Sequence, residues 1–358
     1  MRRIILLAVV SLLVGSGCAE RNPQPSVSMS ESRQATPVPA LPSTPAVLTP
    51  TRLTLVYSTA SAANSPLQLA QTNGLFRDNG LDVELVHAPG NAGPAALLSG
   101  QAQVMSSGCA EAISAIAGGG DFVFLLTTIN RMQYVLAGGP NVTGPDSLRG
   151  KRLAVSRLGA SSHLATKFII KQLGLDPDQG VVYVQVGNTP ERVSALLSGS
   201  VDGTILSVDE GTLIGSQPGM RVIVDMTQAD VPYCGNGIVT TRQYLRENPE
   251  SAKRLTRALV AAIAHYKLDR TEGIEATGEF LGEHDLQKLM GTWDTWARMF
   301  PEKPYPEPRG LQFVIDEAAQ ADERARSLTP QQMIDPTWVR ELDDSGYIDK
   351  LYRAARTP

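Results

Sequence analysis

The sequence contains few of the residues from which most metal sites, redox sites and catalytic centres are built. Its 358 residues include 3 cysteines and 4 histidines, and aromatic residues make up 5%. No H-E-x-x-H, C-x-x-C or G-x-S-x-G pattern is present. The histidines are scattered, at His87, His163, His265 and His284. We therefore expect no metal, no cofactor and no enzymatic activity.

Long runs of a single charge are also absent. The net charge is −4, and no long basic run is present, so the sequence gives little support to a nucleic-acid-binding surface. With 42% apolar and 19% charged residues, the chain has enough apolar surface to fold into one large or two medium domains with proper cores.

The first 18 residues have the pattern of an export signal. Arg2 and Arg3 precede an apolar stretch, residues 4–14, which is too short to span a bilayer as a mature helix. Small residues then lead into Cys18, a pattern that resembles the lipobox of bacterial lipoproteins, in which the thiol is acylated before cleavage. We predict a signal peptide over residues 1–17 and a lipid on Cys18. Ordinary signal-peptidase cleavage is the alternative, since Gly15 stands where the lipobox usually has leucine.

Residues 18–50 are rich in proline, serine and threonine and show almost no aliphatic periodicity. This composition predicts an extended, solvated tether. Together with the lipid, the tether would hold the folded part of an exported protein at the periplasmic or extracytoplasmic face of a membrane.

Strand, loop and helix then alternate three times. Strands are predicted at residues 53–57, 83–86 and 102–105, each followed by a Gly-, Ser- or Asn-rich loop and a helix. This alternation predicts a largely parallel sheet covered by helices, with all strand-to-helix loops at the same edge.

The same plan returns about a hundred residues later. The strand predicted at 152–156 begins a second series, and Ala-Leu-Leu-Ser-Gly occurs at both 96–100 and 195–199. Shared turn chemistry in two unrelated units is the simpler alternative. The ordered recurrence of several landmarks favours two similar lobes.

Four ordered segments carry a resemblance to a known family. They are A-x-x-x-G-L-F with G-L-D-V between residues 70 and 83, and residues 98–104, 146–152 and 197–203, with shorter matches at residues 117–121 and 248–250. In these the chain resembles the periplasmic binding proteins of nitrate, sulfonate and bicarbonate importers, a group that includes thiamine-pyrimidine-precursor binders. Where this family often has Asp-Pro, the chain has Val208-Asp209-Glu210.

The resemblance implies an α/β, type II periplasmic-binding-protein fold. Such a fold has two lobes, each a mainly parallel sheet flanked by helices, and here it would end in a helical C-terminal segment. Residues 51–131 and 246–358 would form lobe one and residues 132–245 lobe two, with hinges near 129–134 and 241–245.

The resemblance also implies a function. The chain would be a monomeric solute-binding lipoprotein of an ABC importer that captures a small polar solute, anionic or heterocyclic, by hinge closure. It would then deliver the solute to a membrane permease with its ATPase. An exported solute-sensing receptor without transport is one alternative, and an enzyme of the same fold acting on a pyrimidine or carboxylate is another.

The binding site is expected where loops and helix starts converge beyond the carboxyl ends of the strands. The segment 159–163 is the strongest candidate, and the carboxylates of Glu111 and Asp209 would repel an anion if they face the cleft. The full set of predicted ligand-binding residues is Ser58, Thr59, Asn64, Gly90, Asn91, Ser107, Gly108, Cys109, Glu111, Gly159, Ser161, Ser162, His163, Asn188 and Asp209.

Two further cysteines, Cys109 and Cys234, lie far apart in the sequence. The lobe boundaries above place Cys109 in lobe one and Cys234 in lobe two, where a bond between them would pin or strain the cleft. We therefore expect two free thiols.

Overall fold

A computed structural model describes residues 50–90, 92–229 and 231–354. The expected signal peptide, Cys18 and almost all of the tether lie outside these residues. The described residues belong to one compact unit. Within the described ranges, no helix is both long and apolar enough to cross a membrane.

The first sheet has five strands in the order β2-β1-β3-β10-β4. β1 is parallel to β2 and β3, whereas β10 runs antiparallel between β3 and β4. The bounds are β1 Thr51–Tyr57, β2 Leu81–His87, β3 Val104–Gly108, β4 Phe122–Arg131 and β10 Pro232–Thr241. The predicted loop at residues 106–109 is instead the end of β3 and the first residue of the next helix.

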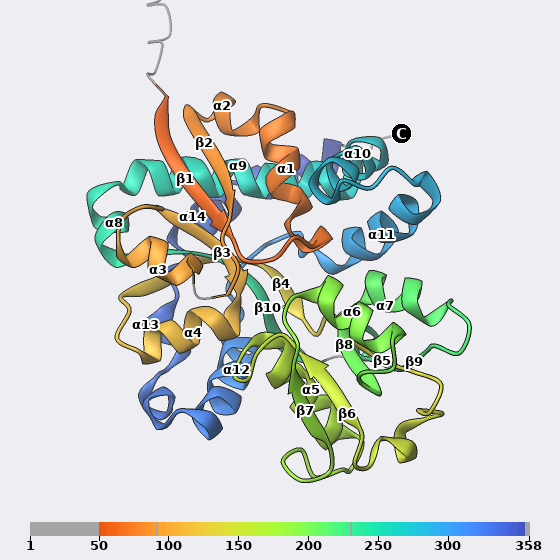
Figure 1. Ribbon diagram of the computed structural model, residues 1–358. Coiled ribbons are helices and arrows are strands. Elements are labelled where there is room, and N and C mark those ends of the chain that lie inside the picture. Colours follow the sequence, from red (N-terminus) through yellow and green to blue (C-terminus); the bar gives the residue numbers. More distant parts are fainter. Residues whose placement is uncertain (1–49, 91, 230, 355–358) are drawn as a thin grey trace, which may run out of the picture. The chain divides into compact units, whose positions relative to one another are not determined.

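The second sheet has five shorter strands in the order β7-β6-β8-β5-β9. β6 is parallel to β7 and β8, and β5 is antiparallel to β8 and β9. The bounds are β5 Tyr134–Gly138, β6 Arg152–Val155, β7 Val182–Gln185, β8 Gly203–Ser207 and β9 Arg221–Asp225. We call the two sheets with their helices lobe one and lobe two (Figure 1).

Helices follow the strands in both lobes. In lobe one they are α1 Ser65–Thr72, α2 Leu75–Asp78, α3 Ala92–Leu98 and α4 Cys109–Ala117, and in lobe two α5 Ser161–Gln172, α6 Thr189–Leu197 and α7 Val208–Gly215. The C-terminal helices are α8 Arg242–Glu247, α9 Pro249–Leu268, α10 Arg270–Leu281, α11 Leu286–Met299, α12 Pro308–Ala321, α13 Pro330–Met333, α14 Thr337–Asp344 and α15 Tyr347–Ala354. Short 3₁₀ turns are η1 Ala62–Asn64, η2 Pro145–Leu148, η3 Met226–Gln228 and η4 Glu323–Ser327.

Apolar residues on alternate faces of the first sheet make two cores. Leu55 of β1 lies in one core with Leu259 of α9, and its neighbour Val56 lies in the other with Ile113 of α4. This is the alternation that a strand covered on both faces requires. The second of these cores continues into lobe two, where Phe168 of α5 packs edge-on against Phe313 of α12 with ring centroids 4.7 Å apart.

The position of β10 corrects the expected path of the chain. The residues assigned to lobe two were expected to run to 245, but β10 pairs with β3 and β4 in lobe one. The return crossing therefore lies between β9 and β10, at residues 226–231, rather than at 241–245. Antiparallel pairing with two buried strands explains the early return, because β10 is itself buried along most of its length.

The same correction overturns the expectation of free thiols. Register pairing sets Asn236 of β10 opposite Gly108, the residue before α4. Cys234 therefore lies beside Cys109, and the two form a disulfide with Cα atoms 5.6 Å apart. That distance is normal for a disulfide. The bond ties β10 to the start of α4 within lobe one and does not cross to lobe two.

Candidate functional site

A pocket of about 340 Å³ lies between the two lobes, at the carboxyl ends of their parallel strands. Ser58 follows β1 and Gly108 ends β3 on the lobe-one side, while Ser156 follows β6 and Ser207 ends β8 on the lobe-two side. The volume is within the range of small-molecule sites, and the position is the one that open α/β sheets use for ligands.

The pocket brings together eight of the fifteen predicted residues. They are Ser58, Thr59, Gly90, Gly108, Glu111, Ser161, Ser162 and Asn188. Ser162 also has a structural role, because its hydroxyl accepts from Ser156 N–H at 3.0 Å and lies 2.7 Å from the Ser156 hydroxyl.

Six predicted residues lie outside the pocket lining, and Asn91 lies outside the described residues. Asn64 is buried beneath the pocket, where its amide donates to the Thr59 carbonyl at 2.8 Å and its Oδ1 accepts from Ser106 at 2.7 Å. Ser107 is fully buried in β3 and donates to the Gly108 carbonyl at 3.1 Å. Cys109 is held in the disulfide.

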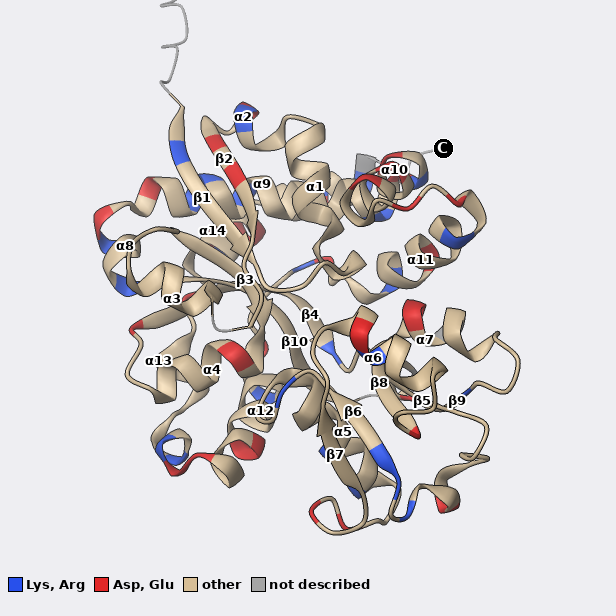
Figure 2. Ribbon diagram, in the orientation of Figure 1, with Lys and Arg blue, Asp and Glu red and all other residues tan. Residues whose placement is uncertain are grey.

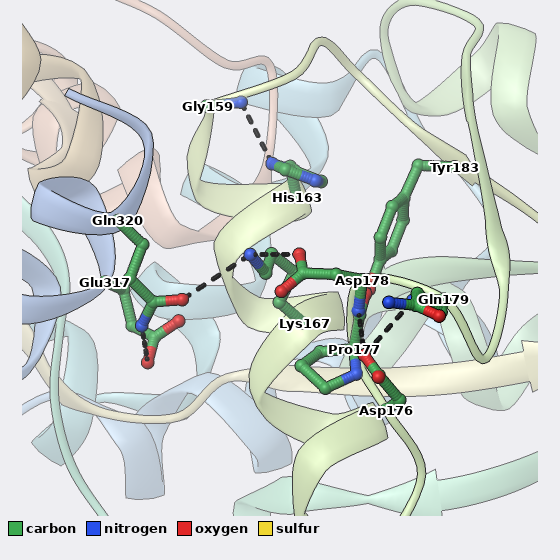
Figure 3. Close-up of polar contacts among 10 residues, drawn as sticks. All are labelled: Gly159, His163, Lys167, Asp176, Pro177, Asp178, Gln179, Tyr183, Glu317 and Gln320. Atoms are coloured by element: carbon green, nitrogen blue, oxygen red, sulfur yellow. Dashed lines mark hydrogen bonds and ion pairs between the residues drawn. The ribbon is translucent and has the colours of Figure 1, made fainter.

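Gly159 and His163, which are not part of the pocket lining, bond to each other, as Figure 3 shows. The Gly159 N–H donates to His163 Nδ1 at 3.0 Å, and the imidazole packs edge-on against Tyr183 with ring centroids 4.7 Å apart. Burial lowers the pKa of His163, and the charge of Lys167 lowers it further. A neutral imidazole that accepts this bond fixes the turn before α5.

Asp209 lies in a different place from Glu111. It lines a second cavity of about 290 Å³, with Thr292 and Thr295 of α11. Burial raises the pKa of Asp209. This carboxyl is therefore part of the contact between α7 and α11, rather than of the solute pocket.

Sequence reasoning missed several pocket residues. Tyr134 begins β5, Gln133 lies in the crossing just before it, and Asn236 comes from β10. Arg192 lies in α6, and its side chain turns back to donate to the carbonyls of Gly187 at 2.9 Å and Ile205 at 3.3 Å. It is 6% exposed, and its Nε has no partner among the described residues.

One side-chain contact spans the pocket from lobe to lobe. Glu111, in the first turn of α4, accepts from the Ser161 hydroxyl at 2.7 Å and from the Ser161 N–H at 3.3 Å. Ser161 is the first residue of α5 and is 5% exposed. The pocket is therefore bordered on one side by a carboxylate bonded to a helix N-terminus.

The pocket carries charges of both signs. Acidic residues occupy the first turns of α4, α6 and α7, as Figure 2 shows, and Glu111, Glu191 and Glu210 line the pocket. Arg157 and Arg192 line it as well. Burial raises the pKa of Glu210 to about 7, with repulsion from Asp209 as the next cause. Burial lowers the pKa of Arg192.

Comparison with known families identifies the group to which the chain belongs. More than half of the chain, residues 62–269, matches the family model described as NMT1/THI5 like. The chain belongs to the NMT1/THI5-like family. A Bacillus subtilis (strain 168) protein, YtlA, whose name gives it as a candidate binding protein, is 22% identical over 223 residues. That match covers 59% of this chain and 65% of YtlA, so the chain spans slightly less than two thirds of this relative.

Solved structures of two periplasmic binding proteins share the fold. The nitrate-binding protein NrtA from Synechocystis PCC 6803 has a TM-score of 0.68 at 13% identity, covering 83% of this chain and 89% of NrtA. The aliphatic sulphonate binding protein SsuA from Escherichia coli has a TM-score of 0.61 at 20% identity, covering 80% of this chain and 93% of SsuA. The predicted two-lobed type II periplasmic-binding-protein fold is confirmed, although each sheet is mixed, with two parallel and two antiparallel pairings, rather than mainly parallel as expected.

Proposed function

We propose that this NMT1/THI5-like protein is an extracytoplasmic solute-binding protein of an ABC importer. One small polar solute would bind in the pocket between the lobes and be delivered to a membrane permease driven by its ATPase. The observation that supports this most directly is the pocket itself, which has polar groups from both lobes on its walls. A solute that contacts both lobes stabilises the closed arrangement over an open one.

The two chain crossings give the proposed closure its hinge. One lies between β4 and β5, at residues 132–133, and the other at residues 226–231. Lobe two is otherwise joined to lobe one by packing and by side-chain hydrogen bonds such as that of Ser161 to Glu111, so small dihedral changes in these two segments would rotate it once those bonds open. Closure, rather than a reaction, is then the functional step, which is why we propose a binding protein and not an enzyme.

Export and a lipid on Cys18 complete the proposal. The apolar stretch before Cys18 favours export, and two of the structures that share the fold are periplasmic proteins. A lipid anchor with a tether at residues 18–50 would keep a monomer close to its permease. Mass spectrometry of the membrane fraction tests this, because a lipidated product must begin at Cys18 and Cys18→Ala must release it.

Solute capture is tested by native mass spectrometry of the full-length protein after exposure to spent growth medium. We expect one bound small molecule per chain. Asn188→Trp places a large side chain at an exposed position of the pocket wall and should remove the bound mass. Asn141→Trp adds the same side chain at an exposed turn of lobe two outside the pocket, and should leave the bound mass in place.

A bound mass that both variants retain equally would place the solute elsewhere. Absence of any bound mass from the wild-type protein would contradict solute binding itself. A solute that binds without any change in the solution scattering curve would favour a receptor that signals without hinge closure.

A further inference from the structure

The start of α5 is already occupied by a carboxylate of the protein itself. The first N–H groups of a helix have no partner within the helix, and they carry a partial positive charge that attracts anions. Here the Ser161 N–H and hydroxyl donate to the two oxygens of Glu111, which comes from the other lobe. An incoming oxyanion would have to displace this carboxylate to use the same donors.

Gly108 makes room for the contact between Glu111 and Ser161. A Cβ atom on residue 108 would overlap both Glu111 Oε2 and Ser161 Oγ. A side chain at residue 108 would therefore force the two groups apart. The close approach of the carboxylate to α5 depends on a glycine at the end of β3.

The wall of the same pocket also offers a hydrogen-bond acceptor without a partner among the described residues. Gln133 is 8% exposed and lines the pocket, and its Oε1 has no partner among the described residues. A carboxylate has about four acceptor positions, and Ser161 uses two of those on Glu111. A buried acceptor left unpaired is costly, so a solute with N–H groups would satisfy it.

The donors of Arg192 are mostly committed to the protein. The guanidinium of Arg192 donates to three oxygen atoms of lobe two, and only its Nε is without a partner among the described residues. Three of its five N–H groups are thereby used, whereas a sulfonate or nitrate needs several donors. Arg157 also lines the pocket and is half-buried. The charge preference set by Glu111 therefore applies only to the end of the solute that faces α5.

We infer that Glu111 excludes oxyanions from the start of α5 and selects a solute that presents an amine or amidine, cationic at neutral pH, to Glu111 and Gln133. This inference rests on the proposed function, since it names the class of solute for the same pocket. Glu111 is then the specificity-determining residue of the site.

Calorimetric titration of the full-length protein with methanesulfonate and with ethylammonium tests the inference. In Glu111→Gln the charge at the start of α5 is removed, so methanesulfonate should bind at least about tenfold more tightly and ethylammonium at least about tenfold more weakly than in wild type. Asp146→Asn removes one charge from an exposed turn of lobe two outside the pocket, and should change both affinities less than about threefold.

Equal affinity of wild type and Glu111→Gln for methanesulfonate, including no measurable binding by either, overturns the exclusion of oxyanions. Equal affinity for ethylammonium overturns the cationic class. Glu111→Asp serves as a second variant that keeps the charge, and it should still bind methanesulfonate more weakly than Glu111→Gln does. Thermal unfolding of each variant without solute establishes that it is folded.

The outcomes separate this inference from the proposed function. Capture of a sulfonate or nitrate by the wild-type protein in native mass spectrometry would leave the proposed function standing and overturn the inference. Gain of methanesulfonate binding by Glu111→Gln, with no solute captured by wild type, would support the role of Glu111 and contradict solute transport.

Discussion

The two lobes share a plan but differ in how firmly they are held. In lobe one, β4 and β10 are ten residues each and buried along most of their length, and a disulfide joins β10 to α4. In lobe two the strands have four or five residues, and the outer strands expose Val182 and Val222 at 52% and 38%. Lobe one is therefore built as a fixed platform, and lobe two as a smaller body with less apolar surface buried.

This difference indicates which pocket residues are held in a fixed position and which would move with lobe two. Glu111 and Asn236 project from the platform, next to the disulfide. Arg192, Ser161 and Glu210 come from lobe two. A hinge motion would therefore bring the groups of lobe two to a preformed wall. Since the side chains of that wall are already ordered, the entropic cost of ordering them on binding is lower.

Removal of the disulfide should have the largest effect on the difference in stability between the two lobes. The bond closes a loop with a sequence separation of 125 residues, so the double variant Cys109→Ala/Cys234→Ala should lose about 4 kcal/mol of unfolding free energy. Urea denaturation of wild type and variant measures this. The loss should appear in the amide hydrogen exchange of β3, β10 and α4 before that of lobe two.

Reduction by dithiothreitol is the matched control for the disulfide. It should destabilise wild type and leave the double variant unchanged. Separate Cys109 and Cys234 peptides in an unreduced digest would show that the bond is absent. Lobe one would then have no covalent link between β10 and α4.

The pH dependence of stability should distinguish the lobes through Glu210. Its pKa rises from 4.5 to about 7 on folding, so folded lobe two binds more protons than the unfolded chain between these values. Stability therefore falls as pH rises from about 4.5 to 7. Glu210→Gln should remove on the order of 3 kcal/mol of this decline, with Glu191→Gln as the control. An identical pH profile for Glu210→Gln and wild type would contradict the raised pKa.

The weakest expected effect concerns a contact between the lobes. Lys167 of α5 pairs with Asp178 at 2.7 Å and donates to Gln320 of α12 at 3.5 Å (Figure 3). Asp178 is largely exposed, so Lys167→Met should cost about 0.5 kcal/mol or less of unfolding free energy in urea denaturation. A loss above about 2 kcal/mol would show that this contact locks the lobes and would argue against free closure.

Much of the fold could be predicted because its signals are local. The strand, loop and helix units around Ser58, Gly90 and Ser161 are marked by glycine, serine and apolar alternation, and these loops meet at the pocket as parallel strands require. Glu111 was recognised as a residue that would alter the class of solute if it faced the cleft, and it lines the pocket.

The remainder depends on pairing between distant segments. The path of β10 decides the position of Cys234 and Asn236, and no local pattern specifies that a strand runs antiparallel between β3 and β4. Arg192 has the sequence surroundings of a surface helix residue, yet its guanidinium folds inward to the Ile205 carbonyl. Gln133 lies in a chain crossing, so its place in the pocket depends on the arrangement of both lobes.

The central claim is that one solute binds between the lobes, and a crystal structure of the protein with the solute found by native mass spectrometry tests it most directly. We expect the solute in the pocket, in contact with Glu111 or Gln133 and with at least one residue of α5, α6 or α7. A solute that contacts only one lobe, or that lies in the cavity beside Asp209 and α11, would contradict the claim.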